Sequence, residues 1–213
     1  MANKHDVRRD FERIGNWVDT RSRVLDLGCG DGDLLDYLHT VKQTQGVGVE
    51  INDERVIACV KRGVNVIQQN LDEGLAMFGD QQFDTVVLSQ TLQAVHQTEH
   101  VLLEMVRVAR MGVVSFPNFG YWPHGWSILR GRMPVTGQMP YAWYNTPNIH
   151  LCTLKDFEDL CDKLGLRIVE RVTFGPDNEV KWLPSWRATL ALYRFTAAAQ
   201  PSKQASDVGV LDE

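Results

Sequence analysis

Three glycines follow directly after a short apolar run near the N-terminus. Gly28, Gly30 and Gly32 lie in the string Leu-Gly-Cys-Gly-Asp-Gly, which connects residues 23–27 to a helical pattern. Glycine lets the backbone turn sharply and come close to a ligand, because no side chain stands in the way. The unpaired N–H groups at the start of the helix add hydrogen-bond donors. This spacing predicts a ligand-binding turn between a strand and a helix.

Two classes of cofactor use such a turn, and the charges around this one separate them. In the dinucleotide fingerprint G-x-G-x-x-G, the third glycine would fall at Asp33. Asp26, Asp31 and Asp33 would also repel a pyrophosphate, because like charges repel. S-adenosylmethionine carries a sulfonium and an ammonium group and no phosphate. The acids therefore favour S-adenosylmethionine, or its product S-adenosylhomocysteine, and disfavour a dinucleotide-dependent oxidoreductase.

Further polar side chains follow the later strands. Glu50 ends the second expected strand, where a carboxylate can accept hydrogen bonds from both ribose hydroxyls. Asp72 could accept from the adenine amine, and Leu71 could cover the ring. Ser89 and Gln90 follow the fourth strand, at the floor of the same crevice. The residues expected to bind the cofactor are Asp26, Gly28, Cys29, Gly30, Gly32, Glu50, Ile51, Leu71, Asp72, Ser89 and Gln90.

Some of these residues also have a purely structural interpretation, which the sequence leaves open. Asp72 could be a surface or capping carboxylate. Ser89 and Gln90 could satisfy backbone groups at the end of a strand. Asp33 could simply interact favourably with the dipole of the following helix.

The segments around the turn alternate between apolar runs typical of buried strands and helical patterns. The expected strands cover residues 23–28, 46–51, 64–67, 83–89 and 112–116. The expected helices cover residues 7–18, 31–42, 53–60, 73–78 and 98–110, with Asp53 as a cap and Gly63 as a stop. Such alternation predicts βαβ units and a parallel sheet. Thr153 is expected to cap a further helix, and strands at 167–174 and 187–195 should pair antiparallel, since no helical pattern separates them.

Bulk properties place limits on the class of protein. The 213 residues carry a net charge of -5, which gives no electrostatic reason to expect nucleic acid or an anionic membrane as a partner. We expect one domain over residues 1–196 and a disordered tail over 197–213. No apolar stretch approaches the ~20 residues that span a bilayer, and no secretory signal is visible, so we expect a cytoplasmic protein. The four cysteines and six histidines show no metal-ligand spacing, so no metal is expected.

The segment 117–152 interrupts the alternation of strands and helices. It contains several prolines and many aromatic residues, which are Tyr121, Trp122, Trp126, Tyr141, Trp143 and Tyr144. So long a connection inside a compact domain is usually functional or disordered, and the aromatic content argues against disorder. We expect a segment that covers the site, with one or two short helices, for instance around 126–129.

The glycine turn and the acid after the second strand resemble class I S-adenosylmethionine-dependent methyltransferases. More specific strings make the chain similar to the MetW family of methionine biosynthesis, over roughly residues 8 to 172. These strings occupy residues 47–51, 63–68, 70–75, 88–95, 114–120, 131–134 and 144–153. The sequence departs from the family at Gln69-Asn70, where members often have glycine and aspartate.

This resemblance implies a doubly wound α/β fold of the Rossmann-like, class I methyltransferase type. Its seven strands would have the order 3-2-1-4-5-7-6, with strand 7 antiparallel. The resemblance also implies a role in methionine biosynthesis with a homoserine O-acyltransferase of the α/β-hydrolase type, which transfers a succinyl or acetyl group to the homoserine hydroxyl. The chain has no G-x-S-x-G elbow of its own, so we do not expect it to perform the acyl transfer.

Two functions remain open at this point. The chain could bind S-adenosylmethionine as an accessory subunit, with the aromatic segment acting as a lid, a docking surface, or both. Alternatively, it could be a small-molecule methyltransferase, for which His150, Tyr144 and His96 are the candidate catalytic residues. Both histidines also have a non-catalytic interpretation. His96 could be a partly exposed loop residue, and His150 could make a structural hydrogen bond.

Overall fold

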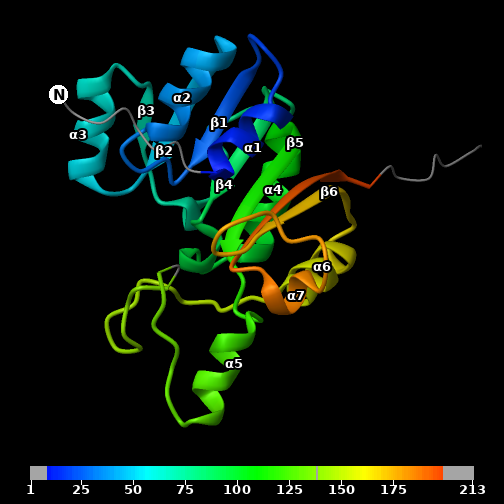
Figure 1. Cartoon of the computed structure of the whole chain (residues 1–213). Coiled ribbons are helices and arrows are strands. Elements are labelled where there is room, and N and C mark those ends of the chain that lie inside the picture. The colour runs from blue at the N-terminus through cyan, green and yellow to red at the C-terminus, as the bar shows by residue number, and fades with distance from the viewer. Residues whose placement is uncertain (1–8, 138, 199–213) are drawn as a thin grey trace, which may run out of the picture.

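The computed structural model of the chain describes residues 9–137 and 139–198 (Figure 1). The strands are β1 (Arg23–Leu27), β2 (Gln45–Glu50), β3 (Val66–Gln68), β4 (Phe83–Ser89), β5 (Ala109–Pro117), β6 (Leu166–Phe174) and β7 (Leu190–Ala197). The α-helices are α1 (Arg9–Trp17), α2 (Asp33–Lys42), α3 (Asp53–Arg62), α4 (Thr98–Val108), α5 (Trp122–Leu129), α6 (Leu154–Lys163) and α7 (Pro184–Arg187). Two short 3-10 helices are η1 (Leu71–Glu73) and η2 (Leu92–Ala94).

All seven strands form one sheet in the order β3-β2-β1-β4-β5-β7-β6, which confirms the expected topology. Strands β1 to β5 are parallel, whereas β7 runs antiparallel to both β5 and β6. The direction of winding reverses between β1 and β4. In open sheets of this kind, a ligand binds beyond the carboxyl ends of the strands at this reversal.

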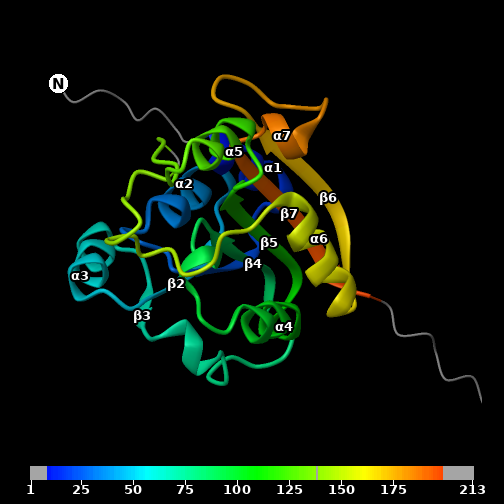
Figure 2. The same ribbon diagram turned by 90° about the horizontal axis from the view of Figure 1, so that it is seen from below.

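Helices cover both faces of the sheet, which explains why the central strands are almost entirely apolar. Figure 2 shows α1, α2 and α3 on one side and α4 and α6 on the other. Side chains of one strand alternate between the two cores. In β4, Val86 and Leu88 pack with residues of α4 and α6, while Val87 packs with residues of α1 and α2.

Several local expectations were wrong in detail. Asn52 rather than Asp53 caps α3, its side chain accepting from Arg55 N, although Gly63 ends that helix as expected. Residues 109 and 110 belong to β5 rather than to the preceding helix, and residues 184–187 form α7 rather than leading directly into the last strand. The expected tail lies outside the described residues, apart from residues 197 and 198.

Thr153 caps α6 as expected, within a capping box that also uses Asp156. In the described parts of the chain, no helix combines the length and apolar character needed to cross a bilayer.

Between β5 and α6 the chain leaves the body of the domain, and α5 extends away from the sheet (Figure 1). We call residues 121–147 the aromatic arm. Its root is held by Asn118, whose side-chain amide donates to the carbonyls of Ser185 and Ala188 beside α7. His124 of α5 is buried, with one ring nitrogen 3.3 Å from the carbonyl of Phe119 and the other 3.4 Å from Thr136 Oγ1.

The burial of His124 makes the packing of the arm sensitive to pH. Desolvation lowers the pKa of its imidazole below the ordinary value of 6.5. A detached arm therefore binds a proton more readily than the packed arm, so the packed state is fully stable above about pH 6.5 and weakens as the pH falls below it.

We expect hydrogen-exchange protection of the α5 amides, corrected for intrinsic rates, to decrease between pH 7 and pH 5.5. The loss should not exceed roughly 1.4 kcal/mol per pH unit for one proton. His124→Gln is the control, because it cannot be protonated and should remove the pH dependence. Equal protection of the wild-type arm at both pH values would contradict this prediction.

Candidate functional site

The turn between β1 and α2 brings backbone, rather than side chains, to the edge of the sheet. Gly28 and Gly30 both have positive φ, at 68° and 58°. A Cβ on Gly28 would lie 2.6 Å from the side chain of Thr91, whereas a Cβ on Gly30 would meet no atom within 4 Å. Gly28 therefore permits close packing inside the protein, while Gly30 leaves open space beside the turn.

Glu50, at the end of β2, is buried and holds this turn in place. One carboxylate oxygen accepts from Gly30 N at 2.9 Å, and the other accepts from Ile51 N and Asn52 N at 2.9 and 3.0 Å. An ionised carboxylate has about four acceptor positions, so about one is left for a ligand. Two ribose hydroxyls could both bind only if one of these backbone bonds were given up.

The turn borders a crevice of about 290 Å³, which we call the glycine crevice. It is lined by Phe11, Asp26, Gly28, Cys29, Gly30, Asp31, Asp33, Leu34, Arg55, Ser89, Gln90 and Thr91. Three of these residues are aspartates and one is an arginine. Arg55 lies 4.0 Å from Glu50, and Asp33 pairs with Arg62 of α3. The excess of carboxylates favours a ligand with positive charge.

The floor of the glycine crevice is formed by residues after β4. Gln90 has a φ of 52°, which is uncommon for a residue with a Cβ. Its N–H donates to both the carbonyl and the hydroxyl of Ser115, and its side-chain amide donates to Asp10 at 3.1 Å. Backbone strain of this kind concentrates at functional sites. Ser89 also contacts Ser115, with 3.2 Å between the two hydroxyl oxygens.

Several residues of this site were missed by the sequence analysis, among them three polar ones. Asp10 and Ser115 are buried behind Ser89 and Gln90, and Arg55 lines the glycine crevice. Asp10 lies in the helix expected over residues 7–18, and its side of α1 packs against the end of β4. No signal in the sequence alone separates it from the other charged residues of the same helix.

Five of the predicted residues do not line the crevice, and the buried Glu50 is one of them. Asp72 instead accepts hydrogen bonds from the backbone of His96 and Gln97, and from the ring of His96 at 3.0 Å. Burial opposes ionisation of Asp72, but these bonds outweigh it and lower the pKa of the carboxyl group. Leu71 packs against the core, and Ile51 is exposed. Gly32 begins α2 beside Cys59 and Val64.

The thiols below the turn are structural. The Sγ atoms of Cys29 and Cys59 lie 3.9 Å apart, and the Cys59 thiol donates to the carbonyl of Gly30. Burial raises the pKa of both thiols, so they remain protonated at neutral pH. Among the described residues, no three potential metal ligands come together.

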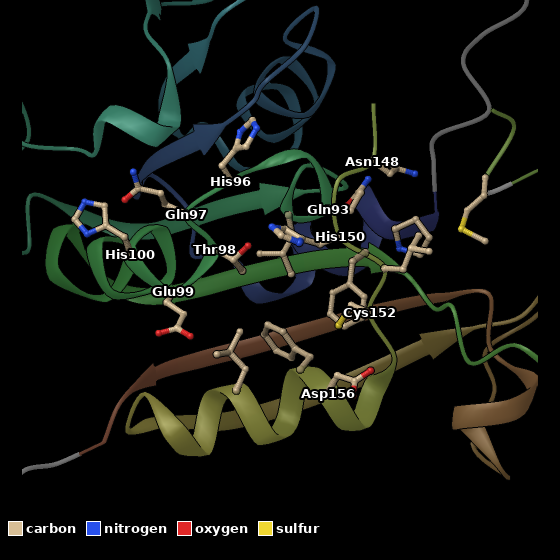
Figure 3. Close-up of a pocket in the computed structure, with 17 residues that line it drawn as sticks. Gln93, His96, Gln97, Thr98, Glu99, His100, Asn148, His150, Cys152 and Asp156 are labelled. Carbon is tan, nitrogen blue, oxygen red and sulfur yellow. The ribbon is translucent and has the colours of Figure 1, made fainter. Parts of the chain in front are cut away.

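A larger cavity of about 550 Å³ lies between α4 and α6, and we call it the α4–α6 pocket. Its walls are largely apolar and include Phe116, Phe157 and Leu92. Figure 3 shows Gln93 and His150 together at one side of the pocket, with Asp156 of α6 at the other.

Residues 89–93 separate this pocket from the glycine crevice, since Ser89, Gln90 and Thr91 line one cavity and Leu92 and Gln93 line the other. Gln93 also connects the two sides. Its amide donates to the carbonyl of Gln90 at 2.7 Å, and its own carbonyl accepts from Ile149 N and His150 N.

The structure brings two of the three candidate catalytic residues into one pocket and leaves the third outside it. His96 and His150 both line the α4–α6 pocket, and His96 is held by Asp72. Tyr144 lies on the aromatic arm, where it is 73% exposed and contacts the ring of Trp143 edge-on.

Comparisons with known proteins agree with this architecture. A curated relative from Rhodopirellula baltica, described as "Bifunctional methionine biosynthesis protein MetXA/MetW", is 39% identical over 204 residues. The match covers 87% of this chain but only 32% of that relative, so this chain spans about a third of its length. A demethylmenaquinone methyltransferase from Bacillus cereus is 27% identical over 82% of this chain and 88% of its own length.

Among solved structures, an S-adenosylmethionine-dependent methyltransferase from Archaeoglobus fulgidus matches with a TM-score of 0.66 and 17% identity, covering 87% of this chain and 90% of the other. At this identity the match supports the fold alone. The sequence profile of one family, described as "Methionine biosynthesis protein MetW", matches residues 8–195. Because this match spans nearly the whole chain and agrees with the fold, the chain belongs to the MetW family of methionine biosynthesis proteins.

Proposed function

We propose that this chain binds S-adenosylmethionine in the glycine crevice and supports homoserine O-acyl transfer by a partner acyltransferase of the α/β-hydrolase type. The observation that carries the binding proposal is the arrangement of Glu50 beside the open side of Gly30. The Glu50 carboxylate accepts from Gly30 N and keeps about one acceptor position for a ribose hydroxyl, and the missing Cβ of Gly30 leaves room for the ligand.

The charges of the crevice fit the same ligand. The sulfonium and ammonium groups of S-adenosylmethionine would lie among Asp26, Asp31 and Asp33, which line the crevice. When bound, the cofactor supplies an electrophilic methyl group. The residues of this chain position it and exclude water, with Gln90 and Ser89 at the floor. Ile51, Leu71 and Asp72 are proposed to face the adenine end.

The acyltransferase part of the proposal rests on family membership and on the fused relative, whose description names MetXA beside MetW. In that relative the two parts are covalently linked, so they are present in equal amounts and close together. S-adenosylmethionine is made from methionine, so binding it would let this chain report on the end of the pathway.

The first test is calorimetric titration of the chain with S-adenosylmethionine and S-adenosylhomocysteine. We expect Gly30→Ala to weaken binding at least about tenfold, since the new methyl group would occupy the open side of the turn. Gly63→Ala is the matched control, because Gly63 also has a positive φ and open space around it but ends α3 outside the crevice.

The same titration with Glu50→Gln examines the carboxylate. Loss of a hydrogen bond to a charged group should weaken binding about tenfold to a hundredfold. Glu54→Gln, on the exposed side of α3, should bind as the wild type does. If all four variants bound like the wild type, the ligand would lie elsewhere and the proposal for the crevice would fail.

The second test measures the partner directly. We expect the rate of homoserine acylation by the acyltransferase encoded in the same genome to increase as this chain is added, up to one copy per copy of enzyme. Gly30→Ala should change the response to S-adenosylmethionine, because the ligand could no longer bind normally. An unchanged rate in the presence of a stoichiometric complex would rule out a supporting role.

A second candidate function is S-adenosylmethionine-dependent methylation of a small molecule. The α4–α6 pocket favours it, because a largely apolar cavity of about 550 Å³ lies directly beyond the floor of the glycine crevice. His150 lines this pocket and has the position of a possible general base.

If the chain is a methyltransferase, labelled methyl groups should pass from S-adenosylmethionine to a metabolite in a cell extract. His150→Ala should abolish this transfer. Tyr144→Phe is the comparison, because Tyr144 is not among the residues that line the pocket. Absence of S-adenosylhomocysteine formation with a broad set of acceptors would count against this function.

A further inference from the structure

Five of the six tryptophans of the chain are at least half exposed to solvent. The exposed fractions are 58% for Trp122, 50% for Trp126, 74% for Trp143, 68% for Trp182 and 66% for Trp186. The sixth, Trp17, is buried against the sheet. Tryptophan is highly buried on average in folded proteins, so exposure on this scale calls for an explanation.

These five tryptophans are not scattered. Trp122 and Trp126 lie one turn apart on α5, and Trp143 lies on the returning half of the aromatic arm. Trp182 and Trp186 belong to the connection between β6 and β7, at and before α7.

The connection between β6 and β7 packs against the root of the arm. Asn118 donates to two carbonyls beside α7, and a Cβ on Gly120 would lie 2.9 Å from the carbonyl of Ser185. Both views place α7 close to α5 (Figures 1 and 2). We call the five residues together the tryptophan surface.

The area available at this surface is large enough for a stable complex. A tryptophan that becomes fully buried covers up to about 250 Å², so five at half exposure or more offer roughly 600 Å². Exposed apolar neighbours on the arm add to this area, and they are Ile128, Leu129, Met133, Val135, Tyr141 and Tyr144. The sum approaches the ~800 Å² per partner of a standard protein interface.

The chemistry of the surface is that of a protein interface. Tryptophan and arginine are the residues most enriched among those that dominate binding energy. Arg130 lies over the ring of Trp126 at 4.9 Å, and Arg187 lies over the ring of Trp182 at 5.5 Å. Each cation thus lies beside an aromatic ring, and both arginines are exposed.

We propose that the tryptophan surface is where the partner acyltransferase docks. This inference rests on the proposed function. The fused relative identifies the occupant, because an additional polypeptide named MetXA shares one chain with a domain 39% identical to this one. An acyltransferase unit is therefore always available to cover this surface in that protein. We infer that the corresponding acyltransferase makes the same contact with the present chain.

The test measures binding of the purified acyltransferase to the full chain by sedimentation velocity and calorimetry. Trp122→Gln/Trp126→Gln and Trp182→Gln/Trp186→Gln should each weaken the complex roughly 30-fold or more, since tryptophan anchors commonly contribute that much. The matched control is Ile57→Gln/Val60→Gln, which replaces two exposed apolar residues of α3 on another part of the molecule. Its affinity should stay within about twofold of the wild type.

Titration of each variant with S-adenosylmethionine checks that the domain remains folded. If the wild type and both tryptophan variants bind the acyltransferase equally well, the docking surface lies elsewhere, although the proposed function stands. If the wild type does not bind the acyltransferase at all, the proposed function and the docking surface both fail. If the chain alone sediments as a dimer that the tryptophan substitutions dissociate, the surface joins two copies of this chain and the proposal is overturned.

Discussion

The hydrogen bond from Gly30 N to the carboxylate of Glu50 connects the ends of β1 and β2, and the glycine crevice depends on it. The bond is possible because the two strands pair in parallel, with Asp26 opposite Gly48. Gly48 must lack a side chain, since a Cβ there would lie 2.4 Å from the sulfur of Cys29. The site therefore rests on close backbone packing below the turn, and the ligand-facing groups are a consequence of it.

Residues 89–93 support the crevice from the side opposite the glycine turn. The left-handed conformation of Gln90 is maintained by two hydrogen bonds to Ser115 and one to Asp10, which together offset the backbone strain. Gln93 then links this floor to residues 149 and 150, where the aromatic arm returns to the domain. A continuous path of hydrogen bonds thus connects the floor of the glycine crevice, the α4–α6 pocket and the residues that follow the arm.

Periodicity was sufficient to predict most elements of the fold, because buried strands and amphipathic helices leave distinct apolar patterns. It failed at boundaries, where side-chain capping and local turns decide the outcome. Asn52 and Asp53 are both suitable caps, and only the backbone conformation of Asn52 selects it. Residues 184–187 were missed as a helix because four residues cannot display a helical period. Arg55 reaches the crevice, and Asp10 supports its floor, through packing between elements distant in the sequence, which no local pattern encodes.

The order of the strands in the sheet was expected only from the resemblance to a known family. The glycine turn, the acid after the second strand, most strands and helices along the chain and the strings similar to the MetW family were predictable from the residues alone. These features depend on residue types at short spacing, so they can be read along the chain. Three other features became visible in the folded chain: Glu50 already binds three backbone N–H groups, Asp72 turns towards His96, and five tryptophans stay exposed. The physical reason is that burial and hydrogen-bond partners are properties of the packed elements, which bring together residues far apart in sequence.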